Sequence, residues 1–84
     1  MKFKARVEVR LKEGYLDPEA ATVKRALRDL GHKVEEARTA KVYELLLEAG
    51  NLEEARKQVR EMCRRLLSNP VKDDYWFEVK EVKS

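Results

Sequence analysis

The N-terminal stretch of this chain alternates apolar and charged residues almost without error. Between residues 2 and 12, five apolar positions fall on one face and six charged positions fall on the other: Phe3, Ala5, Val7, Val9 and Leu11 against Lys2, Lys4, Arg6, Glu8, Arg10 and Lys12. A period of two over ten residues predicts a β-strand with one buried and one exposed face.

Two segments have the three- and four-residue spacing of amphipathic helices. The first begins at Asp17-Pro18-Glu19, which supplies a side-chain cap and a proline in the first turn, and it stops at Gly31. The second begins at Asn51, and Pro70 forces it to end at about Ser68. Their predicted apolar stripes are Ala20, Val23, Ala26, Leu27 and Leu30, and Leu52, Ala55, Val59, Met62, Cys63, Leu66 and Leu67.

Three further segments, 33–39, 41–48 and 74–82, are predicted to be strands. The connection at Thr39 and Ala40 is too short for a crossover, so the first two of these strands should form an antiparallel hairpin. The predicted order is β-α-β-β-α-β. We therefore expect a single domain over residues 1–84 of the α+β class, a two-layer sandwich. Its four-stranded antiparallel sheet would be covered by two helices on one face, in a ferredoxin-like plan or a close variant.

Composition excludes several classes of function. Nineteen basic and sixteen acidic residues give a net charge of +3, a mixture that argues against a nucleic-acid footprint. The central strands of the predicted sheet also lack the exposed aromatic side chains on which RNA-recognition motifs stack bases. No apolar run approaches a membrane span of ~20 residues. One cysteine and one histidine fit a reducing compartment, so a cytoplasmic protein is expected.

No constellation of reactive side chains stands out. Cys63 lies in mid-helix with no base positioned beside it, and a small core residue is the simpler interpretation. His32 follows a glycine in a loop without a second ligand at metal-binding spacing. The three glycines are spread one per turn and cannot form a phosphate-binding loop. We predict no catalytic, metal-binding or cofactor-binding residue in this chain.

Apolar side chains also appear on the predicted open face of the sheet, the face turned away from the helices. Val42, Leu46, Trp76 and Val82 lie there among opposed charges, a mixture typical of protein–protein contacts. A chain of this size buries only roughly 60–65% of its unfolded surface, so association would add to a thin margin of stability. We therefore expect a homodimer or a higher assembly that uses these four residues.

Several motifs together resemble one known family. The alternating strand leads into Lys12-Glu13-Gly14-Tyr15-Leu16-Asp17-Pro18, and Ala26-Leu27 and Leu30-Gly31 follow. Arg38-Thr39-Ala40-Lys41 precedes Val42-Tyr43-Glu44-Leu45, and Leu66-Leu67-Ser68-Asn69-Pro70-Val71 precedes Tyr75. In this order and spacing the motifs resemble the PurS-type small subunit of phosphoribosylformylglycinamidine synthase. The chain departs from the family at Ala20 and Ala40, where glycine is frequent, and Ala40 puts a positive-φ turn at that point in doubt.

The resemblance implies a subunit without catalytic residues in a glutamine-dependent ligase of de novo purine biosynthesis. Such subunits dimerise and bridge a large synthetase subunit to a glutaminase, and the assembled enzyme uses ATP, magnesium and glutamine. The motif positions that would contact these partners are Asp17, Pro18, Arg38, Lys41, Asn69, Pro70 and Val71. For Asp17, Pro18, Asn69 and Pro70, a role confined to shaping turns is an equal alternative.

Two other functions stay open at this point. One is a stand-alone ferredoxin-like regulatory module that binds a small effector on the sheet or at a dimer interface. The other is a small hydrolase of the acylphosphatase type, which shares the predicted plan. That enzyme would need an arginine-bearing phosphate loop after the first strand, whereas Gly14-Tyr15-Leu16-Asp17 is acidic there.

Overall fold

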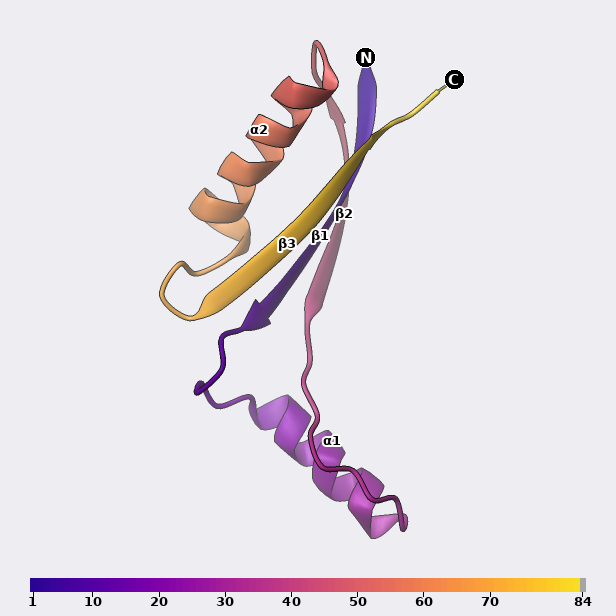
Figure 1. Cartoon of the computed structure of the whole chain (residues 1–84), viewed down its shortest axis with the longest axis vertical. Helices are drawn as coiled ribbons and strands as arrows, with labels where there is room; N and C mark the ends of the chain where they lie inside the picture. The colour runs from indigo at the N-terminus through magenta and orange to yellow at the C-terminus, as the bar shows by residue number, and fades with distance from the viewer. Residues whose placement is uncertain (84) are drawn as a thin grey trace.

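The computed structural model describes residues 1–83 and arranges them as an α+β fold with a three-stranded antiparallel sheet (Figure 1). In chain order the elements are β1 (Lys2–Leu11), α1 (Pro18–Asp29), β2 (Lys41–Glu48), α2 (Leu52–Met62), the π-helical turn η1 (Cys63–Leu67) and β3 (Asp73–Glu81). The strand order is β2-β1-β3, so the N-terminal strand lies in the centre of the sheet.

The predicted alternation of β1 is confirmed by its burial. Val7 pairs with Tyr43 on β2 and Phe77 on β3, and these positions share the face toward α2. Phe3, Ala5 and Val7 are fully buried, as are Ala55, Val59 and Cys63 from α2 and η1. Fully burying a valine or phenylalanine side chain contributes about 1.5–3 kcal/mol, so the central strand supplies much of the core.

The predicted placement of the first helix is wrong. Among residues 1–83, α2 packs on β1 and β3 and η1 adds Cys63 to the same core, whereas α1 projects beyond the end of the sheet beside residues 31–40 (Figure 1). We call α1 together with residues 30–40 the arm. Because the arm points away, the apolar stripe of α1 stays largely uncovered: Val23 is 43% exposed and Leu30 75%, and within α1 only Ala20 is buried.

The predicted fourth strand and its hairpin are also wrong. Residues 33–39 run in one direction from the end of α1 into β2 and, within the part of the chain that the structure describes, pair with no strand (Figure 1). A two-residue hairpin needs positive φ at one or both of its central positions. Among residues 1–83, positive φ occurs only at Gly14 and Gly31. Thr39 and Ala40 therefore continue the chain instead of reversing it.

The second helix begins as predicted and ends differently. The Asn51 side chain accepts a hydrogen bond from the Glu54 amide at 2.8 Å, and the Glu54 carboxylate accepts one from the Gly50 amide at 3.2 Å. The expected helix to Ser68 widens after Met62 into η1, where the Ser68 amide bonds the Cys63 carbonyl at 2.9 Å, five residues back. This wider turn moves Leu66 off the buried stripe, and its side chain is 83% exposed.

The outcome is a slender molecule, with principal extents of 51 × 30 × 14 Å. Its radius of gyration is 16.6 Å, against about 12 Å for a compact chain of this length. Its accessible surface of 6758 Å² exceeds by roughly 1,500 Å² the value expected for a compact protein of its mass, about 5,200 Å². The uncovered arm explains why the surface is so large.

Candidate protein-interaction site

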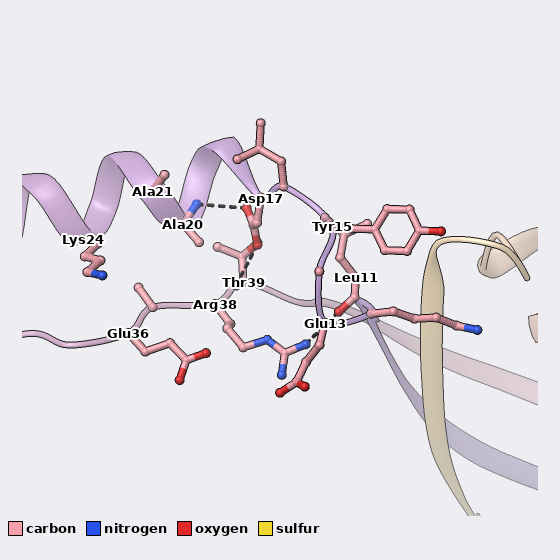
Figure 2. Close-up of a pocket in the computed structure, with 14 residues that line it drawn as sticks. Leu11, Glu13, Tyr15, Asp17, Ala20, Ala21, Lys24, Glu36, Arg38 and Thr39 are labelled. Carbon is pink, nitrogen blue, oxygen red and sulfur yellow. Dashed lines mark hydrogen bonds between the residues drawn. The ribbon is translucent and has the colours of Figure 1, made fainter.

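The junction between the sheet and the arm is held by one carboxylate. Asp17 is the N-cap of α1, and its Oδ1 accepts a hydrogen bond from the Ala20 amide at 2.9 Å. Its Oδ2 accepts hydrogen bonds from the hydroxyl of Thr39 at 2.8 Å and from the Thr39 amide at 3.2 Å (Figure 2). Asp17 therefore ties the incoming and outgoing segments of the arm together, which gives it a structural role whether or not it contacts a partner.

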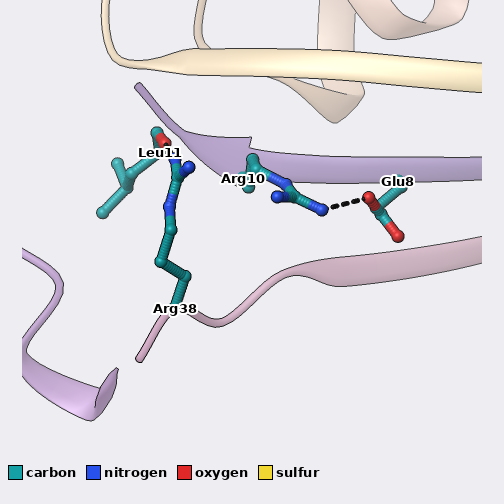
Figure 3. Close-up of polar contacts among 4 residues, drawn as sticks. All are labelled: Glu8, Arg10, Leu11 and Arg38. Carbon is teal, nitrogen blue, oxygen red and sulfur yellow. Dashed lines mark hydrogen bonds and ion pairs between the residues drawn. The ribbon is translucent and has the colours of Figure 1, made fainter. Parts of the chain in front are cut away.

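Arg38 ties the same junction from the other side. Its guanidinium Nη2 donates a hydrogen bond to the carbonyl oxygen of Leu11, the last residue of β1, at 2.7 Å (Figure 3). This contact gives Arg38 a structural role in addition to the partner contact that the family resemblance implies. Lys41, the first residue of β2, is exposed. Contact of Arg38 and Lys41 with a partner stays a prediction.

A groove of about 500 Å³ lies at this junction (Figure 2). Its walls come from the loop after β1, the first turns of α1 and the outgoing residues 36–39. Tyr15 and Leu16 contribute exposed apolar surface, while Lys24 and Arg38 contribute positive charge. Pro18 stands at the first position of α1, as the capping pattern predicted. Nothing in the sequence signals a role for Thr39 and Leu11 at this junction, because their contacts depend on where the arm points.

The turn between η1 and β3 is fixed by its own hydrogen bonds. Asn69 Oδ1 accepts from the amides of Val71 and Lys72, at 2.9 and 3.3 Å, and the Asn69 amide donates to the Asp73 carboxylate at 2.8 Å. Asn69 and Pro70 therefore shape the turn. Val71 is 67% exposed at its tip, so an apolar side chain is presented on a well-ordered support. Such a surface suits a partner contact, which stays a prediction here.

The open face carries the predicted mixture of apolar and charged side chains. Val42 and Trp76 lie on either side of Glu8 in the register of the sheet, and Glu8 accepts a charge-assisted hydrogen bond from Arg10 (Figure 3). Leu46 is 64% exposed four residues further along β2, and Val82 is exposed just after β3. These four residues are between 40% and 64% exposed within residues 1–83, and self-association through them stays a prediction.

The two reactive residue types are poorly placed for chemistry. Cys63 is fully buried in the core, and burial raises the pKa of its thiol, which disfavours the nucleophilic thiolate. His32 is exposed just after the end of α1. Within residues 1–83, no group of three or more His, Cys, Asp or Glu side chains could hold a metal ion. None of the described helices is long and apolar enough to span a membrane.

The Asp17 contacts also act on its protonation. The Ala20 amide and then the Thr39 hydroxyl donate to the charged carboxylate and lower its pKa below the ordinary value of 3.8. A lowered pKa in the folded state means that this carboxylate stabilises the fold above its unfolded-state pKa. That contribution is lost as the pH falls through the folded-state pKa. Near neutral pH, both the helix cap and the link to Thr39 are therefore fully formed.

We expect Thr39→Val to raise the pKa of Asp17 toward its ordinary value, because the variant removes a hydroxyl donor and keeps the Ala20 amide bond. NMR titration of the side-chain carboxyl carbons measures the midpoint. Thr22→Val is the matched control, since the Thr22 hydroxyl bonds the Pro18 carbonyl and not Asp17. An Asp17 midpoint that is the same in both variants would contradict the role of the Thr39 hydroxyl.

Fold and surface together define a class of protein: a small α+β subunit with a three-stranded antiparallel sheet, a projecting helical arm and exposed apolar surfaces at several points. A family model described as PurS, phosphoribosylformylglycinamidine (FGAM) synthase, matches residues 4–81. The chain belongs to this PurS family. The resemblance noted in the sequence is thereby confirmed, as is a role as a subunit of this ligase in purine biosynthesis.

Individual relatives agree over nearly the whole chain. The PurS subunit of Methanothermobacter thermautotrophicus is 45% identical over 83 residues, which span 99% of each chain, and that of Bacillus subtilis is 40% identical over 95% of each. The structure of PurS from Thermus thermophilus has a TM-score of 0.88 at 42% identity, covering 99% of this chain and 100% of that one. A chain in the structure of PurLQS from Thermotoga maritima has a TM-score of 0.86 at 33% identity, covering 95% and 99%.

Proposed function

We propose that this chain is an assembly subunit of phosphoribosylformylglycinamidine synthase with no catalytic residue of its own. It joins the ATP-dependent synthetase subunit to the glutaminase subunit and favours transfer of ammonia between them. ATP, magnesium and glutamine are used by the larger subunits, in the cytoplasm. The observation that carries this proposal is the likeness, over 95% of the chain, to a chain in the structure described as PurLQS.

The surface chemistry supports a binding role over an enzymatic one. The exposed apolar side chains are spread over the arm, the turn before β3 and the open face, so several partners can be contacted at once. The contacts proposed for the larger subunits are the arm junction, with Asp17, Pro18, Arg38 and Lys41, and the turn at Asn69, Pro70 and Val71. The turn offers a preorganised apolar tip, a feature that lowers the entropic cost of binding.

We also propose a homodimer in which each arm is covered by a second copy. Two apolar surfaces are covered incompletely among residues 1–83: the stripe of α1, and the face of β2 on which Tyr43 and Leu45 pack against the core but stay partly exposed, since α2 packs mainly on β1 and β3. In a two-layer sandwich these surfaces would cover each other. Since α1 points away from its own sheet, the β2 surface of another copy is the complementary site.

The areas involved suit a permanent dimer. If each chain covers its excess of roughly 1,500 Å², two chains bury about 3,000 Å², within the range of obligate homodimers, about 2,000–5,000 Å². The open face, with Val42, Leu46, Trp76 and Val82, is then left for association beyond the dimer. The charged residues on the open face make it more polar than the interface expected of a permanent dimer, so a contact through it should be weaker.

The function is tested by reconstitution from purified subunits. Without this chain, glutamine-dependent synthesis by the two larger subunits should fall about 100-fold or more at dilute subunit concentrations, because the chain supplies their effective concentration. Adding the chain back should restore it. The control supplies ammonium salt directly, which should support synthesis with or without the chain.

Unchanged glutamine-dependent activity in the absence of the chain would contradict the assembly role. Turnover by the isolated chain that disappears on Cys63→Ser or His32→Gln would contradict the absence of catalytic residues.

A further inference from the structure

The passage from the arm into β2 is a hinge made of two residues, Thr39 and Ala40. On one side of it, residues 33–38 run beside α1, and on the other side β2 begins at Lys41, with no reversal between them (Figure 1). Thr39 is held by Asp17 through its amide and its hydroxyl, at 3.2 and 2.8 Å. Its neighbour Arg38 is held by the carbonyl oxygen of Leu11 at 2.7 Å. The hinge is thus fixed in its straight form from both sides.

The same chain has room for a second, closed arrangement. The face of β2 on which Tyr43 and Leu45 stay partly exposed could receive the apolar stripe of the chain's own α1. On the incoming side, residues 12–17 span up to roughly 20 Å when extended and include Gly14 at φ 90°, so this loop can follow the helix inward. On the outgoing side, residues 33–38 would have to fold back along β2. The two-residue hinge is therefore the segment that limits closure.

The hinge sequence opposes that reversal. Two-residue hairpins use type I′ or II′ turns, which need positive φ at one or both central positions and are typical of Asn-Gly or a leading glycine. Thr39 is β-branched and Ala40 carries a Cβ, so both resist the left-handed region. The hydrogen bonds of Thr39 to Asp17 would also be broken if the arm rotated onto the sheet. Turn chemistry and the junction contacts therefore favour the same, straight form.

We propose that Thr39 and Ala40 act as a conformational switch that commits the arm to a second copy, and that a turn-forming pair at these positions closes the arm onto its own sheet. The inference rests on the homodimer proposed above. It adds that the choice between an exchanged dimer and a compact monomer is encoded in the turn chemistry of these two residues, while the link of Thr39 to Asp17 only supports the straight form.

The test replaces the hinge by a hairpin turn, Thr39→Asn with Ala40→Gly, in the full chain. Light scattering should report a monomer, and small-angle scattering should give a radius of gyration near 12 Å. Thr39→Val is the matched control: it removes the hydroxyl bond to Asp17 without supplying a turn, and it should remain a dimer. Inserting Gly-Asn-Gly between Thr39 and Ala40 is a second route to closure, since longer hinges disfavour exchange, and it should also give a monomer.

The possible results separate the two proposals. If the unaltered chain is a monomer, the homodimer proposal fails and the switch fails with it. If the unaltered chain is a dimer and both hinge variants remain folded, extended dimers, the switch is wrong while the homodimer stands. A monomeric Thr39→Val variant would overturn the proposal that turn geometry at Thr39 and Ala40 prevents the arm from closing. Because these measurements need no larger subunit, they do not depend on the assembly role.

Discussion

The double variant Val23→Lys, Leu30→Lys is expected to convert the dimer to a monomer. The two side chains lie seven residues apart on the same stripe of α1 and are 43% and 75% exposed in a single chain. Fully burying an exposed valine or leucine contributes about 1.5–3 kcal/mol; Leu30 can gain most of this value and Val23 about half of it. Their loss from both copies should therefore raise the dissociation constant about 100-fold or more. Lysine is a good helix former, and a cation near the last turn suits the helix dipole, so α1 itself should persist.

A matched control exists on the open face. Val42→Lys with Leu46→Lys makes the same chemical change at two side chains that are 44% and 64% exposed. Sedimentation equilibrium over a range of concentrations compares the two variants. We expect dissociation for the arm variant and an intact dimer for the open-face variant. The reverse result would place the dimer interface on the open face and reject exchange of the arms.

Phe3→Ala is expected to have the largest effect on stability. Phe3 is fully buried on the central strand and packs with Leu47, Ala49, Ala55 and Val79. Replacing a buried phenylalanine by alanine costs about 3–5 kcal/mol through lost burial and the remaining cavity. Typical domains unfold at about 5–15 kcal/mol, so this single change should remove about a fifth or more of the total. Urea denaturation at one fixed protein concentration measures the difference.

Trp76→Ala provides the control for an aromatic residue in the same sheet. Trp76 is 54% exposed on the opposite face, and surface changes of this kind usually alter stability by about 0.5 kcal/mol or little more. If Phe3→Ala cost no more than Trp76→Ala, the core described around β1 would be wrong. A large effect of Trp76→Ala at constant dimer content would instead show that the open face is covered in solution.

The local elements could be predicted because they depend on neighbours in the sequence. The two-residue period of β1 fixes which side chains face the core, and the burial of Phe3 and Val7 follows from it. The capping residues Asp17 and Asn51 mark helix starts by hydrogen bonds that span three residues. Such short-range rules leave little freedom, so the structure confirms them.

The position of α1 could not be predicted in this way. The apolar stripe of α1 indicates only that Val23 and Leu30 need an apolar neighbour. Either the chain's own sheet or a second chain can supply that neighbour. The expected hairpin at Thr39 and Ala40 was inferred from the shortness of the connection. The decisive property was the reluctance of both residues to adopt positive φ, which the departure at Ala40 had signalled.

The interaction site was predictable in part. Asp17, Pro18, Asn69 and Pro70 shape turns in the structure, as one of the two interpretations held. The contact between Arg38 and Leu11 joins residues 27 positions apart and needs the fold to be known. Leu66 was placed in the core because a regular helix would put it there. No sequence rule used above signalled the change to a π-helical turn after Met62.

The thinness of the molecule has a geometric consequence. A body 51 Å long and only 14 Å thick presents surfaces at two ends that lie far apart. Compact polypeptides of this size are normally too round to reach two distant points, whereas this chain is elongated. The distance between the two ends depends on the arm as well as on the sheet, so a change in the direction of the arm alters it directly.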